Sequence, residues 1–117
     1  MNNLNPSGDM HRAVAEVATL VDELSAFEDR LNEHMECLCR EEHLPDEMLS
    51  TLADNVYRAL SASRQSRHLG SRVKNWFTVF GEYEGADEVI SVLKSVLGDL
   101  EEVERQVLVI ASVMAAV

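Results

Sequence analysis

The chain has 117 residues, the length of one ordinary domain, and its hydrophobic fraction of 46% is sufficient for a buried core without disulfides or metals. Its 21 acidic and 10 basic residues give a formal charge of −11, which opposes attraction to the polyanions DNA, RNA and anionic membranes. We therefore expect a protein partner, with no direct contact to nucleic acid or membrane.

No targeting or spanning segment is visible. Residues 1–9 lack the basic and apolar parts of a secretory signal, and the longest apolar run, from Val107 to Val117, is far shorter than the ~20 residues that span a bilayer. The two cysteines, Cys37 and Cys39, point to different faces of a predicted helix, so they cannot readily pair with each other. We expect a soluble, cytoplasmic protein with reduced thiols.

Residues 1–8 are rich in Asn, Ser and Gly, which predicts a flexible segment before a single helical domain at 9–117. The first predicted helix runs from about Asp9, a suitable N-cap, to Glu42. If continuous it would extend about 50 Å, more than a compact domain spans, so it either bends near Glu28 or packs lengthwise against a second chain. Glu28 is the one polar member of its seam, whose positions alternate four and three apart: Met10, Val14, Val17, Val21, Leu24, Glu28, Leu31, Met35 and Leu38.

Leu44-Pro45 marks the start of a second helix, because proline disfavours helical geometry before it and suits the first turn after it. The apolar stripe of this helix consists of Leu49, Leu52, Val56 and Leu60. The pattern weakens at 61–63. We expect the helix to end by about His68 with Gly70 as its cap, and a short third helix to follow from Ser71 to Phe80 before a turn at 81–85.

The last predicted helix opens at Ala86-Asp87 and carries an unbroken seam: Val89, Leu93, Val96, Leu100, Val103, Val107, Ile110, Met114 and Val117. No run of alternating polarity predicts a strand. The fold class is therefore all-α, a bundle of about four helices, two of them long. Because two long seams exceed what the rest of the chain can cover, we expect a homodimer. Its predicted self-association residues are Val103, Val107, Ile110 and Met114.

Metal-ligand residue types cluster only at His34, Glu36, Cys37, Cys39, Glu41, Glu42 and His43. Cys39 and His43 could share a helical face, but further ligands are lacking, and no Glu-x-x-His pair of the diiron bundles is present. The sequence also lacks a Gly-rich phosphate loop, a nucleophile elbow and a zinc-protease motif. We expect no metal, no cofactor and no enzymatic activity.

The charge is strongly polarised. Between Asn55 and Gly81 there is no carboxylate, while Arg58, Arg64, Arg67, Arg72 and Lys74 contribute +5, which leaves −16 on the rest of the chain. Four of the six aromatic residues follow closely: Trp76, Phe77, Phe80 and Tyr83.

This basic aromatic segment has two interpretations. In one, its cations pair with carboxylates of neighbouring helices and its aromatic rings belong to the core. In the other, it binds a partner protein, because Trp, Tyr and Arg are enriched at energetic hot spots. The candidate partner-binding residues are Trp76, Phe80, Tyr83, Arg67 and Arg72. The two interpretations coexist if Phe77 and Phe80 face the core while Trp76 faces solvent.

The size, the long helix from Asp9 to Glu42, the Leu44-Pro45 break and the apolar C-terminal helix resemble the small, acidic, helical antiactivators of quorum sensing. Those proteins bind transcription regulators that respond to acyl-homoserine lactones. The resemblance implies a non-catalytic protein that sequesters a transcription regulator and blocks its dimerisation or DNA binding. It supplies no site residues. Alternatives are a secretion or folding chaperone for a basic client and, less favoured, a helical metal protein or a DNA mimic.

Overall fold

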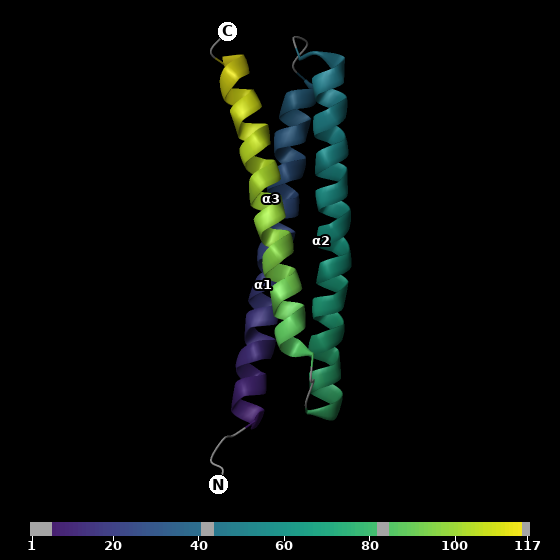
Figure 1. Ribbon diagram of the computed structural model, residues 1–117, viewed down its shortest axis with the longest axis vertical. Helices are drawn as coiled ribbons and strands as arrows, with labels where there is room; N and C mark the ends of the chain where they lie inside the picture. Colours follow the sequence, from purple (N-terminus) through teal and green to yellow (C-terminus); the bar gives the residue numbers. More distant parts are fainter. Residues whose placement is uncertain (1–5, 41–43, 82–84, 116–117) are drawn as a thin grey trace.

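The computed structural model describes residues 6–40, 44–81 and 85–115, and these form three helices: α1 (Pro6–Cys39), α2 (Asp46–Phe80) and α3 (Ala86–Ala115). Successive helices run in opposite directions, and each packs against the other two (Figure 1). Together they make a rod of 66 × 21 × 17 Å. The all-α prediction is confirmed, and the described part of the chain contains no strand.

The expected break in the second helix is wrong, because α2 continues through Gly70 without interruption. Gly70 is buried, and a Cβ atom there would lie only 2.7 Å from Val21 Cγ2 and 3.2 Å from Val17 Cγ1. The glycine therefore allows α1 and α2 to approach closely and does not end a helix. The described residues form three helices where the sequence predicted about four, since the second and third predicted helices are one.

The start of α2 agrees with the predicted start of the second helix, and its end agrees with the predicted end of the third. The Leu49 amide donates a hydrogen bond to the Pro45 carbonyl (3.0 Å), and Asp46 and Glu47 lie in the first turn, where the helix dipole favours negative charge. At the other end Gly81 adopts φ 77°, and its amide donates to the Phe77 carbonyl. A turn thus begins at Gly81.

The first helix differs at its ends from the prediction. It begins at Pro6, ahead of Asp9, because proline is well suited to the first helical position, where its missing N–H leaves nothing unpaired. It ends at Cys39, and the predicted end at Glu42 lies outside the described residues.

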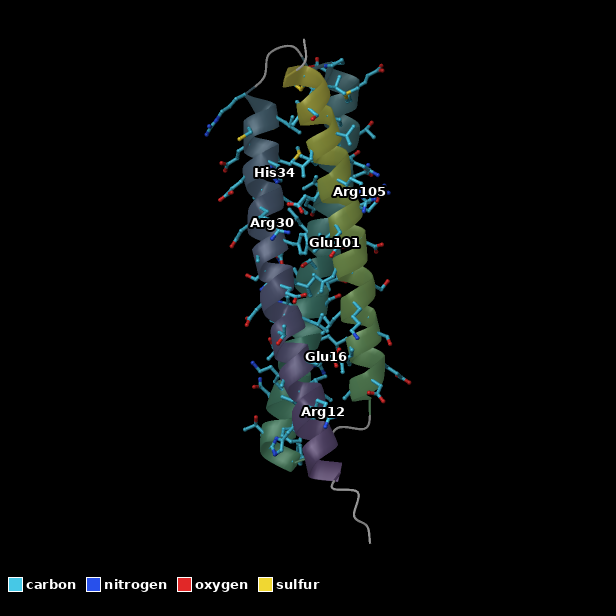
Figure 2. All side chains as sticks on the ribbon, turned by 90° about the vertical axis from the view of Figure 1, so that its left-hand side faces the viewer. Arg12, Glu16, Arg30, His34, Glu101 and Arg105 are labelled. Atoms are coloured by element: carbon cyan, nitrogen blue, oxygen red, sulfur yellow. The ribbon has the colours of Figure 1, made fainter. Side chains whose placement is uncertain are left out.

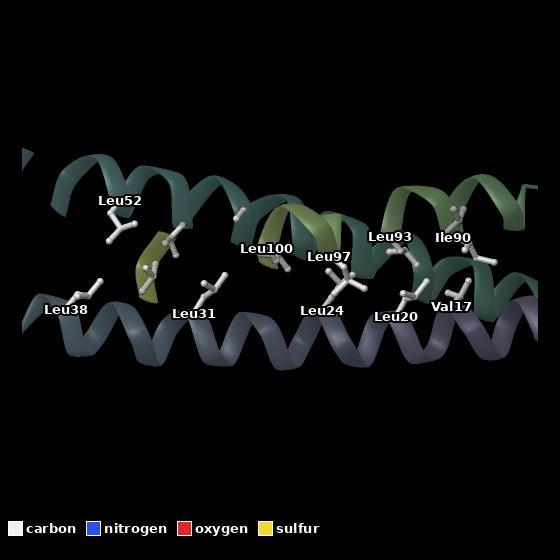
Figure 3. Packing of buried hydrophobic residues seen from close by; sticks show 14 of the residues in the cluster. Val17, Leu20, Leu24, Leu31, Leu38, Leu52, Ile90, Leu93, Leu97 and Leu100 are labelled. Atoms are coloured by element: carbon white, nitrogen blue, oxygen red, sulfur yellow. The ribbon is translucent and has the colours of Figure 1, made fainter. Parts of the chain in front are cut away.

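The predicted seams form the core. In α1 and α3 the fully buried side chains are Val17, Leu24, Leu31, Leu93, Leu100 and Val107, and their neighbours along each seam are buried or half-buried (Figure 3). Met10 and Val117 lie outside the described side chains. From α2 come Leu52, Val56, Ala59 and Val73. Because the second and third predicted helices form one long helix, α2 packs along both α1 and α3. The shortage of chain from which the sequence predicted a homodimer therefore does not exist.

Candidate protein-binding surface

A buried polar cluster joins α1 to α2. Glu28 is 9% exposed, and its carboxylate accepts hydrogen bonds from the Ser63 hydroxyl (2.7 Å) and from Nε and Nη2 of Arg67 (2.6 and 2.9 Å). The two-point contact with the guanidinium and the hydroxyl satisfy a carboxylate that would otherwise be costly to bury. Arg67, a candidate partner-binding residue, is thus an internal ion-pair partner.

The other cations of the basic segment remain at the surface. Arg58, Arg64, Arg72 and Lys74 are exposed, and none forms an ion pair with another described residue. Internal pairing therefore explains Arg67 alone, and α2 presents a basic surface on a protein that is otherwise acidic.

The aromatic residues at the end of α2 divide between core and surface. Phe77 is half-buried and meets the His11 ring edge to face, with centroids 4.9 Å apart. Trp76 and Phe80 are 50% and 60% exposed, and their ring centroids lie 4.4 Å apart. The arrangement in which both Phe77 and Phe80 face the core therefore holds for Phe77 alone, because Phe80 lies four residues after Trp76 and shares its exposed face.

Around these rings the surface is hollowed. The hollow has a volume of about 340 Å³, and Val79, 72% exposed, lies at its edge. Figure 1 shows that α2 continues past the beginning of α3 at this end of the rod, so α3 does not cover it. We call this surface the aromatic end; its residues are Leu69, Arg72, Asn75, Trp76, Val79 and Phe80. Tyr83 lies outside the described residues.

The aromatic end contains apolar rings, one guanidinium and one amide. The rings of such a surface can bury an apolar side chain of a partner protein, and the guanidinium can form an ion pair with a carboxylate of that partner. This combination is typical of interface hot spots.

The tract of metal-ligand types does not converge in the part that the structure describes. His34 Nε2 lies 3.3 Å from Glu104 on α3, and Cys37 and Cys39 are exposed, free thiols. Glu41, Glu42 and His43 lie outside the described residues, and no group of three or more potential ligands forms among the remainder.

The predicted self-association residues lie mostly inside one chain. Val107 is fully buried, while Val103, Ile110 and Met114 are half-buried and pack against the core. Val107 cannot form a dimer contact in this packing, because α1 and α2 already cover it. The exposed apolar residues of α3 are Val92, Leu108, Val109 and Val113.

Within the described ranges, no helix combines the length and apolar character needed to cross a membrane. Comparisons with protein-family models, with curated proteins and with solved structures found no match to this chain.

Proposed function

We propose that this protein is a non-catalytic regulator that acts by binding another protein through its aromatic end. The partner we propose is a transcription regulator, which the protein sequesters as a quorum-sensing antiactivator does, blocking the regulator's dimerisation or DNA binding. The observation that carries the proposal is the exposure of Trp76 and Phe80 beside an exposed arginine, Arg72.

Trp76 and Phe80 lie next to each other at the surface of α2, with their rings in contact and tilted by 40°, and Val79 beside them is also exposed. The end of α2 therefore presents a cluster of exposed apolar side chains. Exposed aromatic rings with a neighbouring guanidinium are the residue types that dominate binding energy at protein interfaces. The overall charge of −11 makes a nucleic acid an unsuitable partner for the whole molecule, and the basic surface of α2 favours an acidic patch on a protein.

A homodimer is also part of the proposal. It is supported by the apolar side chains that α3 still exposes after the chain has folded.

The test is affinity capture from the native host with three baits: the unchanged protein, Trp76→Ala, and Tyr57→Ala as a matched control. Tyr57 is also an exposed aromatic residue of α2, 74% exposed, but it lies outside the aromatic end. We expect a transcription regulator to be captured by the unchanged protein and by Tyr57→Ala, and to be lost with Trp76→Ala.

Circular dichroism should show unchanged helix content for all three baits. The captured regulator should then lose its operator DNA in a gel-shift assay when the unchanged protein is added, and keep it when Trp76→Ala is added. A regulator captured equally by all three baits, or one that keeps its DNA, would contradict the proposal.

A further inference from the structure

The three grooves between the helices are not closed in the same way. Ion pairs cross the groove between α1 and α3: Glu104 binds Nε of Arg30 at 2.9 Å, and Lys94 binds Glu16 at 2.8 Å. Figure 2 shows this face, with Arg30 on α1 beside α3. The groove between α1 and α2 is crossed by the pair of Arg67 with Glu28. Among the described residues, no ion pair joins α2 to α3.

The groove between α2 and α3 is instead open and largely apolar. A hollow of about 650 Å³ is lined by Met48 and Leu52 of α2 and by Val109 and Ile110 of α3. A second hollow of about 370 Å³ continues it towards Ala62 and Val96; both hollows share Asn55, Glu102 and Gln106. Val103 and Ile110, two of the predicted self-association residues, line this groove.

The two edges of the groove present opposite charges at one level. On the α2 edge the exposed Arg58 lines the second hollow, and Glu47 lies nearer the start of the helix. On the α3 edge lie Asp99 and Glu102, of which Glu102 is paired with Arg105 on the same helix. Arg58 and Asp99 line the same hollow, so they stand at the same level along the rod, yet they form no ion pair with each other.

We propose that a second copy of this chain covers this groove, with the two rods parallel and related by a two-fold axis along their length. Rotation about such an axis leaves each residue at the same height along the rod. It places the α2 edge of each copy opposite the α3 edge of the other, so that Arg58 meets Asp99 of the second copy twice in the dimer. An antiparallel two-fold would instead place α2 against α2 and α3 against α3, so that Arg58 would not meet Asp99.

The area fits a dimer of moderate affinity. From Met48 to Ala62, the stretch of α2 that lines the hollows rises about 21 Å at about 1.5 Å per residue. A face of that length, on a rod 21 Å wide, has an area on the order of 400 Å², about half of the roughly 800 Å² per partner that a stable interface buries. The aromatic end lies past the beginning of α3 (Figure 1), so the α3 helix of the second copy leaves it accessible.

The test measures molecular mass by sedimentation equilibrium between about 1 and 100 μM, the range in which moderate dimers dissociate. The unchanged chain should approach twice 13.1 kDa. Ala62 is exposed and lines the second hollow, so Ala62→Glu places a charge inside the proposed interface and should raise the dissociation constant at least a hundredfold. The control is Ala26→Glu, the same substitution at an exposed position of α1, which should leave the mass unchanged.

The charge arrangement has its own test. Arg58→Glu and Asp99→Arg should each weaken the dimer about tenfold, since each brings like charges together twice. An equimolar mixture of the two variants should form dimers again, because every contact in the mixed dimer joins opposite charges. Equal helix content by circular dichroism shows that all variants fold.

This inference rests on the homodimer proposed above, and the outcomes separate the two. A mass of 13.1 kDa at 100 μM overturns both, and the groove is then left to solvent or to a different protein. If the dissociation constant of the dimer is unchanged by Ala62→Glu, the interface proposed here is overturned, while the homodimer itself stands. A dimer weakened by Ala62→Glu but indifferent to both charge reversals overturns the parallel arrangement. The affinity capture that tests Trp76 is a separate measurement and does not depend on any of these dimer results.

Discussion

Replacing Gly70 and Gly98 separately with alanine should change stability in opposite directions. Both glycines lie inside helices, where alanine is more favourable than glycine by about 1 kcal/mol. At Gly98 a Cβ atom would meet nothing within 4 Å, so Gly98→Ala should stabilise the protein by about that amount. At Gly70 the new atom would lie 2.7 Å from Val21 Cγ2, closer than side-chain atoms approach in folded proteins.

Val21 cannot easily avoid this contact, because a β-branched side chain in a helix strongly prefers one rotamer. Overpacking of this kind costs about 1 to 3 kcal/mol, so after the propensity gain we expect Gly70→Ala to lose up to about 2 kcal/mol. In a Val21→Ala background most of this loss should disappear, because only the 3.2 Å approach to Val17 Cγ1 remains. Urea unfolding of the four variants measures this coupling directly. If Gly70→Ala stabilised the protein as much as Gly98→Ala does, the close approach of α1 and α2 would be refuted.

Three further predictions concern charge in the interior and between helices. Arg67→Met should destabilise the protein by about 3 kcal/mol in urea unfolding, because it strands the Glu28 carboxylate, and the double variant with Glu28→Leu should recover most of the loss. The Arg30 guanidinium, by its hydrogen bonds, holds the pKa of Glu104 below its ordinary value. Stability from this carboxylate is therefore complete above about pH 5 and declines below about pH 4; a Glu104→Gln variant that kept the same acid-side slope would contradict this assignment. Val107→Asp, which buries an unpaired charge, should abolish the helical circular dichroism signal, and a normally folded variant would overturn its place in the core.

Periodicity in the sequence predicted the parts of the fold that depend on local pattern. The seams of α1 and α3 are the buried stripes of the structure, and the start of α2 after Pro45 and its end at Gly81 follow from the backbone preferences of those residues. These features need no knowledge of which helix packs against which.

The continuity of α2 could not be predicted in the same way, because it depends on the neighbouring helix. Ser63, Ser66 and Gly70 weaken the apolar pattern and resemble a helix end, but all three are buried where α2 lies against its neighbours. A signal was present in Glu28, the one polar residue of the first seam. A buried carboxylate needs hydrogen-bond donors, and in the structure Ser63 and Arg67 of α2 supply them.

The candidate site was predicted in part. The sequence grouped Trp76, Phe80 and Arg72, and the structure brings them together at one hollow. It also grouped Arg67 with them, although Arg67 lies on the other side of α2 and faces Glu28. Charge and aromatic content identify a segment, whereas the face that each side chain occupies depends on its helical spacing relative to the core.

The role of the aromatic end can be tested most directly with the single tryptophan. Because Trp76 is the only tryptophan, protein grown with 5-fluorotryptophan gives one ¹⁹F resonance, and an unlabelled partner contributes none. On titration with the captured transcription regulator, we predict that this resonance shifts and loses its sensitivity to the exchange of H₂O for D₂O, as the half-exposed ring becomes covered. A regulator that binds while the Trp76 resonance stays unchanged would contradict the proposal that this surface holds the partner.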